Sequence, residues 1–212
     1  RKAMGDHPAL FMVDAVSGLA AHDLRMDEWN IDVIVSGSQK AFMIPPGLSF
    51  MAFSQNALAK QEANPNSRFY WDVTLGLQYQ EAGQTPFTPP ISLYYGLQEA
   101  LKMLEEEGLE NVLTRHRNYR DMVRSSIRAM GLELFTKDAF ASNAVTSICA
   151  PPTIGANVIR KYMLEEFNII LAGGQQKLDD VIFRMGHLGY IRELDLISVL
   201  AALELTLVKF KF

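Results

Sequence analysis

The chain has 212 residues, of which 49% are apolar and 21% charged, and a formal net charge of −4. This length is enough for one large domain or two small ones. The weakly acidic balance gives no general reason to expect nucleic acid or an anionic membrane as partner. The chain contains no run of about 18 apolar residues, so no membrane-spanning helix is predicted. The lone Cys149 excludes an internal disulfide and suits a reducing compartment, so we expect a cytoplasmic protein.

The start of the chain lacks the features of a natural N-terminus. It begins with Arg1 and Lys2, without an initiator methionine, and reaches an apolar stretch within ten residues. It has neither the apolar core of a signal peptide nor a helix-capping start. We therefore expect a fragment or processed piece of a longer protein.

The first quarter of the chain is rich in predicted strands. Short apolar runs predict strands at residues 9–13, 31–35 and 48–53. Because these runs are nearly continuous, we expect parallel or mixed strands that are covered on both faces. Helices are predicted over residues 55–62, after a capping Ser54, and over residues 70–80.

A proline-rich segment, residues 85–90, separates these elements from two predicted helices. The first covers residues 91–107, and the second runs from Leu113 to the glycine at position 131. Beyond it, short strands alternate with helices. Strands are predicted at residues 132–135, 144–150, 168–171 and 181–185, and helices at 157–167 and 195–209. We expect a partial large domain over residues 1–111 and a small α+β domain over residues 112–212.

Lys40 is the residue whose surroundings say most about chemistry. It follows an apolar strand and a small, flexible Ser-Gly-Ser stretch (residues 36–38), and the apolar residues 41–44 come directly after it. A lysine between two apolar segments is unusual unless its amine reacts, for example by forming a Schiff base with a carbonyl. The alternative is an ordinary surface lysine at the end of a strand.

Asp14 ends an earlier apolar strand, at the edge where ligands gather in open α/β sheets. A carboxylate and a lysine in such positions suggest a pyridoxal-phosphate (PLP) enzyme, in which the lysine reacts with the aldehyde and the carboxylate faces the pyridinium nitrogen. The simpler interpretation is a turn or capping residue.

Arg184 lies inside a short apolar strand, where an unpaired guanidinium would be costly. It must find an anion, which is either an internal carboxylate or the carboxylate of a substrate. The sequence leaves these two alternatives open.

Other polar patterns point to no site. The arginines of residues 115–128 lie together with Asp121 and follow three glutamates at residues 105–107, which predicts a solvated, mixed-charge helix rather than a nucleic-acid surface. Gly173 and Gly174 indicate a turn rather than a phosphate-binding loop. His22, His116 and His187 share no metal-ligand spacing, and we predict no metal site.

Four segments together resemble the class V aminotransferases, specifically the alanine/serine–glyoxylate aminotransferase group. They are residues 13–17 (VDAVS), residues 36–47 (SGSQKA through PPG), residues 85–94 and residues 183–189 (FRMGHLG). Their order and spacing extend the resemblance over the whole chain. Cyanobacterial proteins labelled as small subunits of a soluble hydrogenase are similar too. The chain has no cysteine cluster for nickel or an iron–sulfur centre, so hydrogenase chemistry is not supported.

The resemblance implies a role for each matching position. Lys40 would bind PLP and move the proton of the substrate, and Asp14 would keep the ring nitrogen protonated. Val16 would pack against the ring, and Gln39 would contact the phosphate. Further expected roles concern a partner and the substrate: Thr88 and Thr85 would reach the phosphate in a neighbouring subunit of a homodimer, and Arg184 would bind the substrate carboxylate.

The resemblance also implies the fold and the reaction. The fold would be the C-terminal part of a fold-type I, PLP-dependent transferase: a mixed, mostly parallel sheet with a small α+β domain. The family's glycine-rich phosphate loop and stacking aromatic do not precede Arg1, so we expect this chain alone to bind PLP weakly. The expected activity is transamination between a small amino acid and glyoxylate or a similar 2-oxo acid. The alternatives are a non-catalytic fragment that serves dimerisation or partner binding, and a lyase or desulfurase, which the position of Cys149 in a predicted core strand disfavours.

Overall fold

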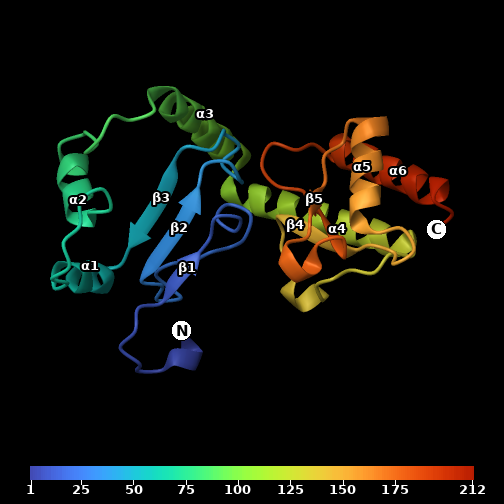
Figure 1. Ribbon diagram of the computed structural model, residues 1–212. Coiled ribbons are helices and arrows are strands. Elements are labelled where there is room, and N and C mark those ends of the chain that lie inside the picture. The colour runs from blue at the N-terminus through green and yellow to red at the C-terminus, as the bar shows by residue number, and fades with distance from the viewer. The chain divides into compact units, whose positions relative to one another are not determined.

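The computed structural model describes all 212 residues and divides the chain into two compact units (Figure 1). The first unit contains residues 1–19 and 24–103, and the second contains residues 20–23 and 104–212. Each unit has its own three-stranded sheet. The boundary that we predict after residue 111 lies within helix α4 (Leu109–Ala129).

The sheet of the first unit is mixed. Its order is β1 (Met12–Asp14), β2 (Val33–Gly37) and β3 (Ser49–Phe53), with β1 parallel and β3 antiparallel to β2. The three predicted strands are thus confirmed, with shifts of up to three residues at their ends. This arrangement places the C-terminal ends of β1 and β2 at one edge of the sheet.

The prediction that all three strands are covered on both faces is wrong. Only β2 is largely buried, whereas Met12 in β1 and Met51 in β3 are 61% and 53% exposed. The register places these two side chains on one face, and Ile34 packs into the small core on the other. The face of Met12 and Met51 is therefore only partly covered, because Val33 on the same face is 3% exposed whereas these two methionines are exposed.

The helices of the first unit are the 3₁₀ turn η1 (Lys2–Met4), α1 (Gln55–Glu62), α2 (Val73–Glu81) and the first part of α3 (Ile91–Glu107). Ser54 caps α1 as predicted, because its hydroxyl accepts the Ala57 N–H at 3.1 Å. A buried carboxylate, Asp32, joins the start of this helix to the sheet. It accepts the Phe11 N–H at 2.8 Å and the Ser54 hydroxyl at 2.9 Å, and these hydrogen bonds, the one from Phe11 first, lower its pKa.

The second unit packs its helices on one face of an antiparallel sheet. The sheet order is β4 (Val145–Cys149), β6 (Ile182–Gly186) and β5 (Ala172–Gly173). The helices are α4, α5 (Ala156–Phe167) and α6 (Glu193–Lys209), with 3₁₀ turns η2 (Asp138–Phe140) and η3 (Gln176–Leu178). Phe183 and Ile148, both fully buried, lie in the core between sheet and helices. This is the α+β arrangement that the sequence predicts.

Two predicted strands are wrong. Residues 132–135 are too short a pairing to count as a strand: one bridge joins Leu134 to Ile148, flanked by backbone hydrogen bonds of residues 133 and 135 to β4. Residues 168–171 form no strand, because Asn168 ends α5 in the left-handed conformation and pairing begins only at residue 172. Both runs are apolar because they pack against the core, which a sequence pattern does not distinguish from strand pairing.

The arginine-rich α4 is less solvated than its charge pattern predicts. Arg124 is 4% exposed and donates two hydrogen bonds to one carboxylate oxygen of Asp138, at 2.6 and 2.9 Å, and one to the Thr136 carbonyl. Its burial is therefore compensated by fixed acceptors. None of the helices combines the length and apolar character needed to cross a membrane.

Candidate active site

The loop that carries Lys40 is fixed by one buried serine. Residues 38–48 connect β2 to β3, and Ser38 is completely buried at their start. Its hydroxyl donates to the Pro45 carbonyl at 2.8 Å and accepts the Leu48 N–H at 3.2 Å, and its own N–H donates to the Leu48 carbonyl at 3.1 Å. These hydrogen bonds hold the end of the 36–38 stretch in place. The flexibility that the sequence predicts for this stretch is therefore not observed at Ser38.

Lys40 is half-buried within a tight turn of this loop. Its carbonyl accepts the Met43 N–H at 3.0 Å, and Met43 has a φ of 63°, a backbone conformation that residues other than glycine rarely adopt. The neighbouring Ala41 and Ile44 are buried. The apolar stretch after the lysine thus anchors the turn, which accounts for the sequence pattern around Lys40.

Helix α3 packs closely on the far side of the loop. Ile44 lies against Gly96, where an added Cβ would be 3.5 Å from the isoleucine Cγ2. Leu93 lies so close to Gly47 that a Cβ there would be 2.4 Å from the leucine Cδ1, and the φ of Gly47 is 147°. A Cβ at Gly96 would make an ordinary contact, whereas one at Gly47 would force Leu93 to move, so the loop is held by packing as well as by hydrogen bonds.

Asp14 lies at the same edge of the sheet as the Lys40 loop. It is the last residue of β1 and pairs with Val35, three residues before the loop begins. One carboxylate oxygen, Oδ1, accepts the Val16 N–H at 2.9 Å, while the side chain remains exposed. The turn interpretation and the functional one are therefore compatible, because this hydrogen bond orients the carboxylate and leaves its second oxygen available.

Val16 and Gln39 lie close to the same glycine. A Cβ on Gly37 would be 3.8 Å from the Val16 Cγ1 and 2.9 Å from the Gln39 Oε1. The segments that follow the C-terminal ends of β1 and β2 thus carry a lysine, a carboxylate, an apolar side chain and an amide. This set of groups fits the requirements of PLP, which needs an amine for its aldehyde, an acid for its ring nitrogen and an apolar surface for its ring.

Arg184 lies in the second unit, on the central strand β6. It pairs with Ser147 in β4 and with Ala172 in β5. Its Nε donates to the Gly173 carbonyl at 2.9 Å, and it forms no ion pair with any carboxylate of the chain. The internal salt bridge that the sequence left open is therefore absent, and both terminal nitrogens of the half-buried guanidinium are free to bind an anion.

The two threonines of the proline-rich segment differ in their hydrogen bonding. The Thr85 hydroxyl donates to the Phe87 carbonyl at 2.7 Å, which fixes the segment locally. Thr88 is exposed. Of the two, Thr88 is the one whose hydroxyl is available to a second molecule.

Comparison with known proteins identifies the family. A family model described as "Aminotransferase class-V" matches residues 2–192. The chain belongs to the class V aminotransferases. This family and its fold-type I structural neighbours depend on PLP, which agrees with the cofactor predicted from Lys40 and Asp14.

Relatives of this class V aminotransferase chain carry two kinds of name. It is 42% identical over 201 residues to the "Soluble hydrogenase, small subunit" of Synechococcus sp. (strain PCC 6716), covering 94% of this chain and 52% of that protein. It is 39% identical over 203 residues to the serine–glyoxylate aminotransferase of Arabidopsis thaliana, covering 95% and 51%. The chain thus spans about half the length of the curated relatives it matches.

The fold of this class V aminotransferase chain agrees with solved structures. Alanine–glyoxylate aminotransferase from Nostoc sp. superposes with a TM-score of 0.89 at 29% identity, over 94% of this chain and 54% of that one. The predicted fold type is therefore confirmed, with the chain corresponding to part of the complete fold.

Sequence reasoning missed a buried hydrogen-bond network in the second unit. Its centre is Asn143, whose N–H donates to the His22 Nε2 at 3.0 Å and whose side chain donates to the Ala21 carbonyl and accepts from Arg120. His187 joins it by donating to the Asn143 carbonyl. The histidine spacing gave no metal pattern, and nothing else in the sequence marked these residues as neighbours.

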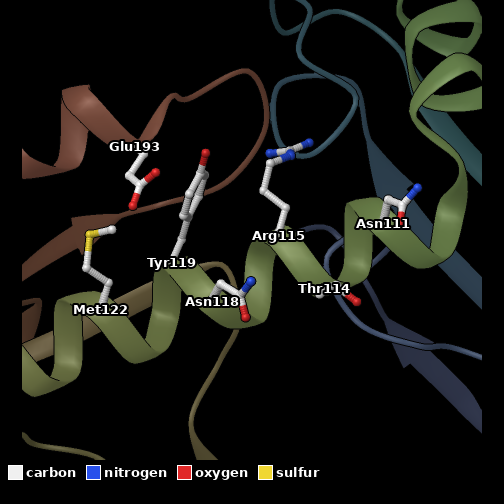
Figure 2. A pocket seen from close by; sticks show the side chains of 7 residues that line it. All are labelled: Asn111, Thr114, Arg115, Asn118, Tyr119, Met122 and Glu193. Carbon is white, nitrogen blue, oxygen red and sulfur yellow. The ribbon is translucent and has the colours of Figure 1, made fainter.

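The surface of α4 carries a hollow of about 460 Å³, also within the second unit (Figure 2). Asn118, Tyr119 and Met122 line it from α4, together with Arg115, and Glu193 lines it from the start of α6. The Arg115 guanidinium is held by Glu107 at 2.7 and 2.9 Å. The main cation at the hollow is thus already neutralised by an internal partner.

Proposed function

We propose that the protein is a PLP-dependent transaminase that transfers an amino group from a small amino acid, of the alanine or serine type, to glyoxylate or a similar 2-oxo acid. The observation that carries this proposal is the placement of Lys40 and Asp14 at one edge of the β1–β2 pair. Family membership and relatives named serine–glyoxylate aminotransferase support the reaction class and the substrates.

Each proposed site residue of the first unit would have a separate role toward PLP. When bound, PLP supplies an aldehyde that reacts with amines and a ring that accepts electrons from the substrate α-carbon. Lys40 Nζ would hold the cofactor between turnovers and then take the proton from the substrate α-carbon. The free Asp14 oxygen would keep a proton on the ring nitrogen. Val16 would pack on the ring, and the Gln39 amide would donate to the phosphate.

Arg184 would bind the substrate rather than the cofactor. Its two free terminal nitrogens match the two oxygens of an α-carboxylate in a bidentate pair. Its Nε, donating to the Gly173 carbonyl, fixes the plane of the guanidinium. An amino acid and a 2-oxo acid share this carboxylate, so one arginine would serve both half-reactions.

Borohydride trapping tests the role of Lys40 directly. Reduction of the PLP-treated protein followed by peptide mass mapping should place the label on Lys40. Lys40→Ala should abolish both the label and transamination, whereas Lys60→Ala, which changes an exposed lysine of the same unit, should preserve both. Labelling elsewhere, or an active Lys40→Ala variant, contradicts the proposal. A screen of amino donors against glyoxylate would then identify the substrate.

We also propose a homodimer, in which Thr88 reaches the cofactor phosphate of the partner. Large aromatic side chains next to this segment support an interface: Phe69 and Trp71 are 77% and 82% exposed, and Tyr70 stacks 4.7 Å from Phe87. Exposed apolar clusters of this kind usually contact a partner. Sedimentation of wild type and Trp71→Ser tests this, with a shift toward monomer expected for the variant.

Desulfurase chemistry would need a reactive thiolate, and Cys149 does not favour one. It ends strand β4, where burial, and secondarily the charge of Glu133, raises the pKa of its thiol. A transaminase therefore fits this chain better than an enzyme with a nucleophilic cysteine. A free thiol of this kind is also consistent with the reducing, cytoplasmic compartment that we propose.

A further inference from the structure

The turn directly after the Arg184 strand is held by an unusual number of buried groups. His187, three residues beyond Arg184, is completely buried. Its N–H donates to the Ala144 carbonyl at 2.9 Å, and its Nδ1 lies 2.9 Å from the Asn143 carbonyl. The loop before β4 thus binds both the backbone and the side chain of one residue.

The hydrogen bonds of His187 define its tautomer. Because a carbonyl can only accept, Nδ1 carries the proton, and Nε2 accepts from the Thr146 hydroxyl at 2.9 Å. Thr146 itself is 1% exposed. Burial lowers the pKa of His187 to about 4, so the ring is neutral at neutral pH. Each of its two nitrogens has one hydrogen-bond partner.

Helix α4 holds the other end of the turn through two consecutive residues. His116 Nε2 accepts the Gly189 N–H at 3.2 Å, and Arg115 Nη1 donates to the Gly189 carbonyl at 3.0 Å. Glu107 fixes Arg115, whose position on α4 Figure 2 shows. His116 is fully buried and its Nδ1 donates to the Val112 carbonyl at 2.7 Å, so its tautomer is defined as well.

These contacts act on the strand that presents Arg184. In β6 the side chains of Met185 and Phe183 point into the core, whereas Arg184 lies on the opposite face. The guanidinium has a single hydrogen bond, to Gly173, so the direction of its terminal nitrogens depends on where the strand backbone lies. The turn beyond Gly186 fixes that backbone at its C-terminal end.

We propose that Thr146, His187 and His116 are positioning residues that hold the β6 backbone so that Arg184 receives the substrate carboxylate. The proposal rests on the function proposed above for Arg184. These three residues form the turn clamp: His187 begins the 187–189 turn, Thr146 binds its ring, and His116 binds the Gly189 N–H. Loosening the turn clamp should weaken carboxylate binding while leaving the reacting groups of the first unit unchanged.

A pair of matched substitutions separates this role from general stability. Thr146→Val removes the hydroxyl that binds His187. Thr206→Val makes the same change at a fully buried threonine of α6, whose hydroxyl donates to the Ala202 carbonyl. In the full-length protein, Thr146→Val should raise KM for L-alanine or L-serine about tenfold with kcat within about twofold, and Thr206→Val should change neither.

Two further measurements complete the test. Hydrogen exchange across residues 182–190 should accelerate in Thr146→Val and not in Thr206→Val, and Thr146→Ser, which keeps the hydroxyl, should behave as wild type. If Thr146→Val does not fold, His116→Gln tests the same clamp from α4, with the same expected rise in KM.

The outcomes distinguish the two proposals. Equal KM values in Thr146→Val and Thr206→Val, while Arg184→Gln raises KM, overturn the positioning role alone. If Arg184→Gln leaves KM unchanged, the proposed function of Arg184 fails, and the turn clamp then has no carboxylate-binding residue to position. A rise in KM in both Arg184→Gln and Thr146→Val, with Thr206→Val unchanged, supports both.

Discussion

Mild acid should destabilise the second unit through the protonation of a buried histidine, His187. His187 has a pKa of 6.5 when exposed and about 4 when folded, because burial disfavours its charged form. Between these values the unfolded chain binds a proton that the folded chain does not, so the free energy of unfolding falls as the pH falls. The full effect is about 3 kcal/mol near pH 4, of which about 2 kcal/mol is already lost at pH 5.

Other groups do not obscure this window. Burial also lowers the pKa of His116 and His22, so both add to the loss in the same direction. The carboxylates with lowered pKa values, Asp32, Asp138 and Asp195, contribute stability that is present at pH 5 and is lost as the pH falls through their ordinary value of 3.8 toward their lower folded values. A change between pH 7.5 and 5 therefore reports on histidines.

His187→Gln isolates the contribution of one ring, since glutamine keeps a polar side chain that does not titrate. Both tryptophans, Trp29 and Trp71, lie in the first unit, so their fluorescence cannot follow the second. Urea-dependent hydrogen exchange of β4 and β6 peptides, corrected for intrinsic pH dependence, measures the second unit. Wild type should lose about 2 kcal/mol more than His187→Gln between pH 7.5 and 5. An equal loss in both proteins would refute the reasoning.

Four further substitutions test the first unit. Gly47→Ala should destabilise it by about 1–3 kcal/mol in urea, because φ is positive and the Leu93 side chain must move to admit a Cβ. Gly76→Ala, in an open helical position, should instead stabilise it by about 0.5–1 kcal/mol. Asp32→Ala should cost about 1–3 kcal/mol in the same titration, because buried donors lose their acceptor. Ser38→Ala should reduce borohydride labelling of Lys40 by loosening its loop, whereas the exposed Ser198→Ala should not; equal labelling would show that the loop keeps its shape without the Ser38 hydroxyl.

The sequence was most informative where chemistry and local pattern coincide. Lys40, Asp14 and Arg184 stood out because a charged group in an apolar run is rare, and the structure places the first two at one sheet edge and leaves the third without an internal carboxylate. The prediction of flexibility at Ser38 was wrong. The small residues around it suggest a flexible stretch, and only hydrogen bonds to Pro45 and Leu48, farther along the loop, fix it. His187 and Asn143 are 44 residues apart, so no local pattern could predict that they meet.

The strand predictions failed for a related reason. Apolar residues such as Ile169 and Leu171 are needed both by paired strands and by extended segments that only pack against a core. Pairing depends on the partner strand, which lies elsewhere in the chain. Met12 and Met51 were expected to be buried and are exposed. A sequence alone does not show which face of a strand another element covers.

The four residues 20–23 belong to the second unit although they lie far from it in sequence. They supply the His22 nitrogen and the Ala21 carbonyl that satisfy the Asn143 backbone and side chain. A domain cut at residue 104 for crystallisation or NMR would leave these buried donors with nothing to bind. Any stand-alone version of this half should therefore carry the short peptide along, grafted through a linker or added in trans, and its affinity for that peptide would measure how much the unit relies on the borrowed segment.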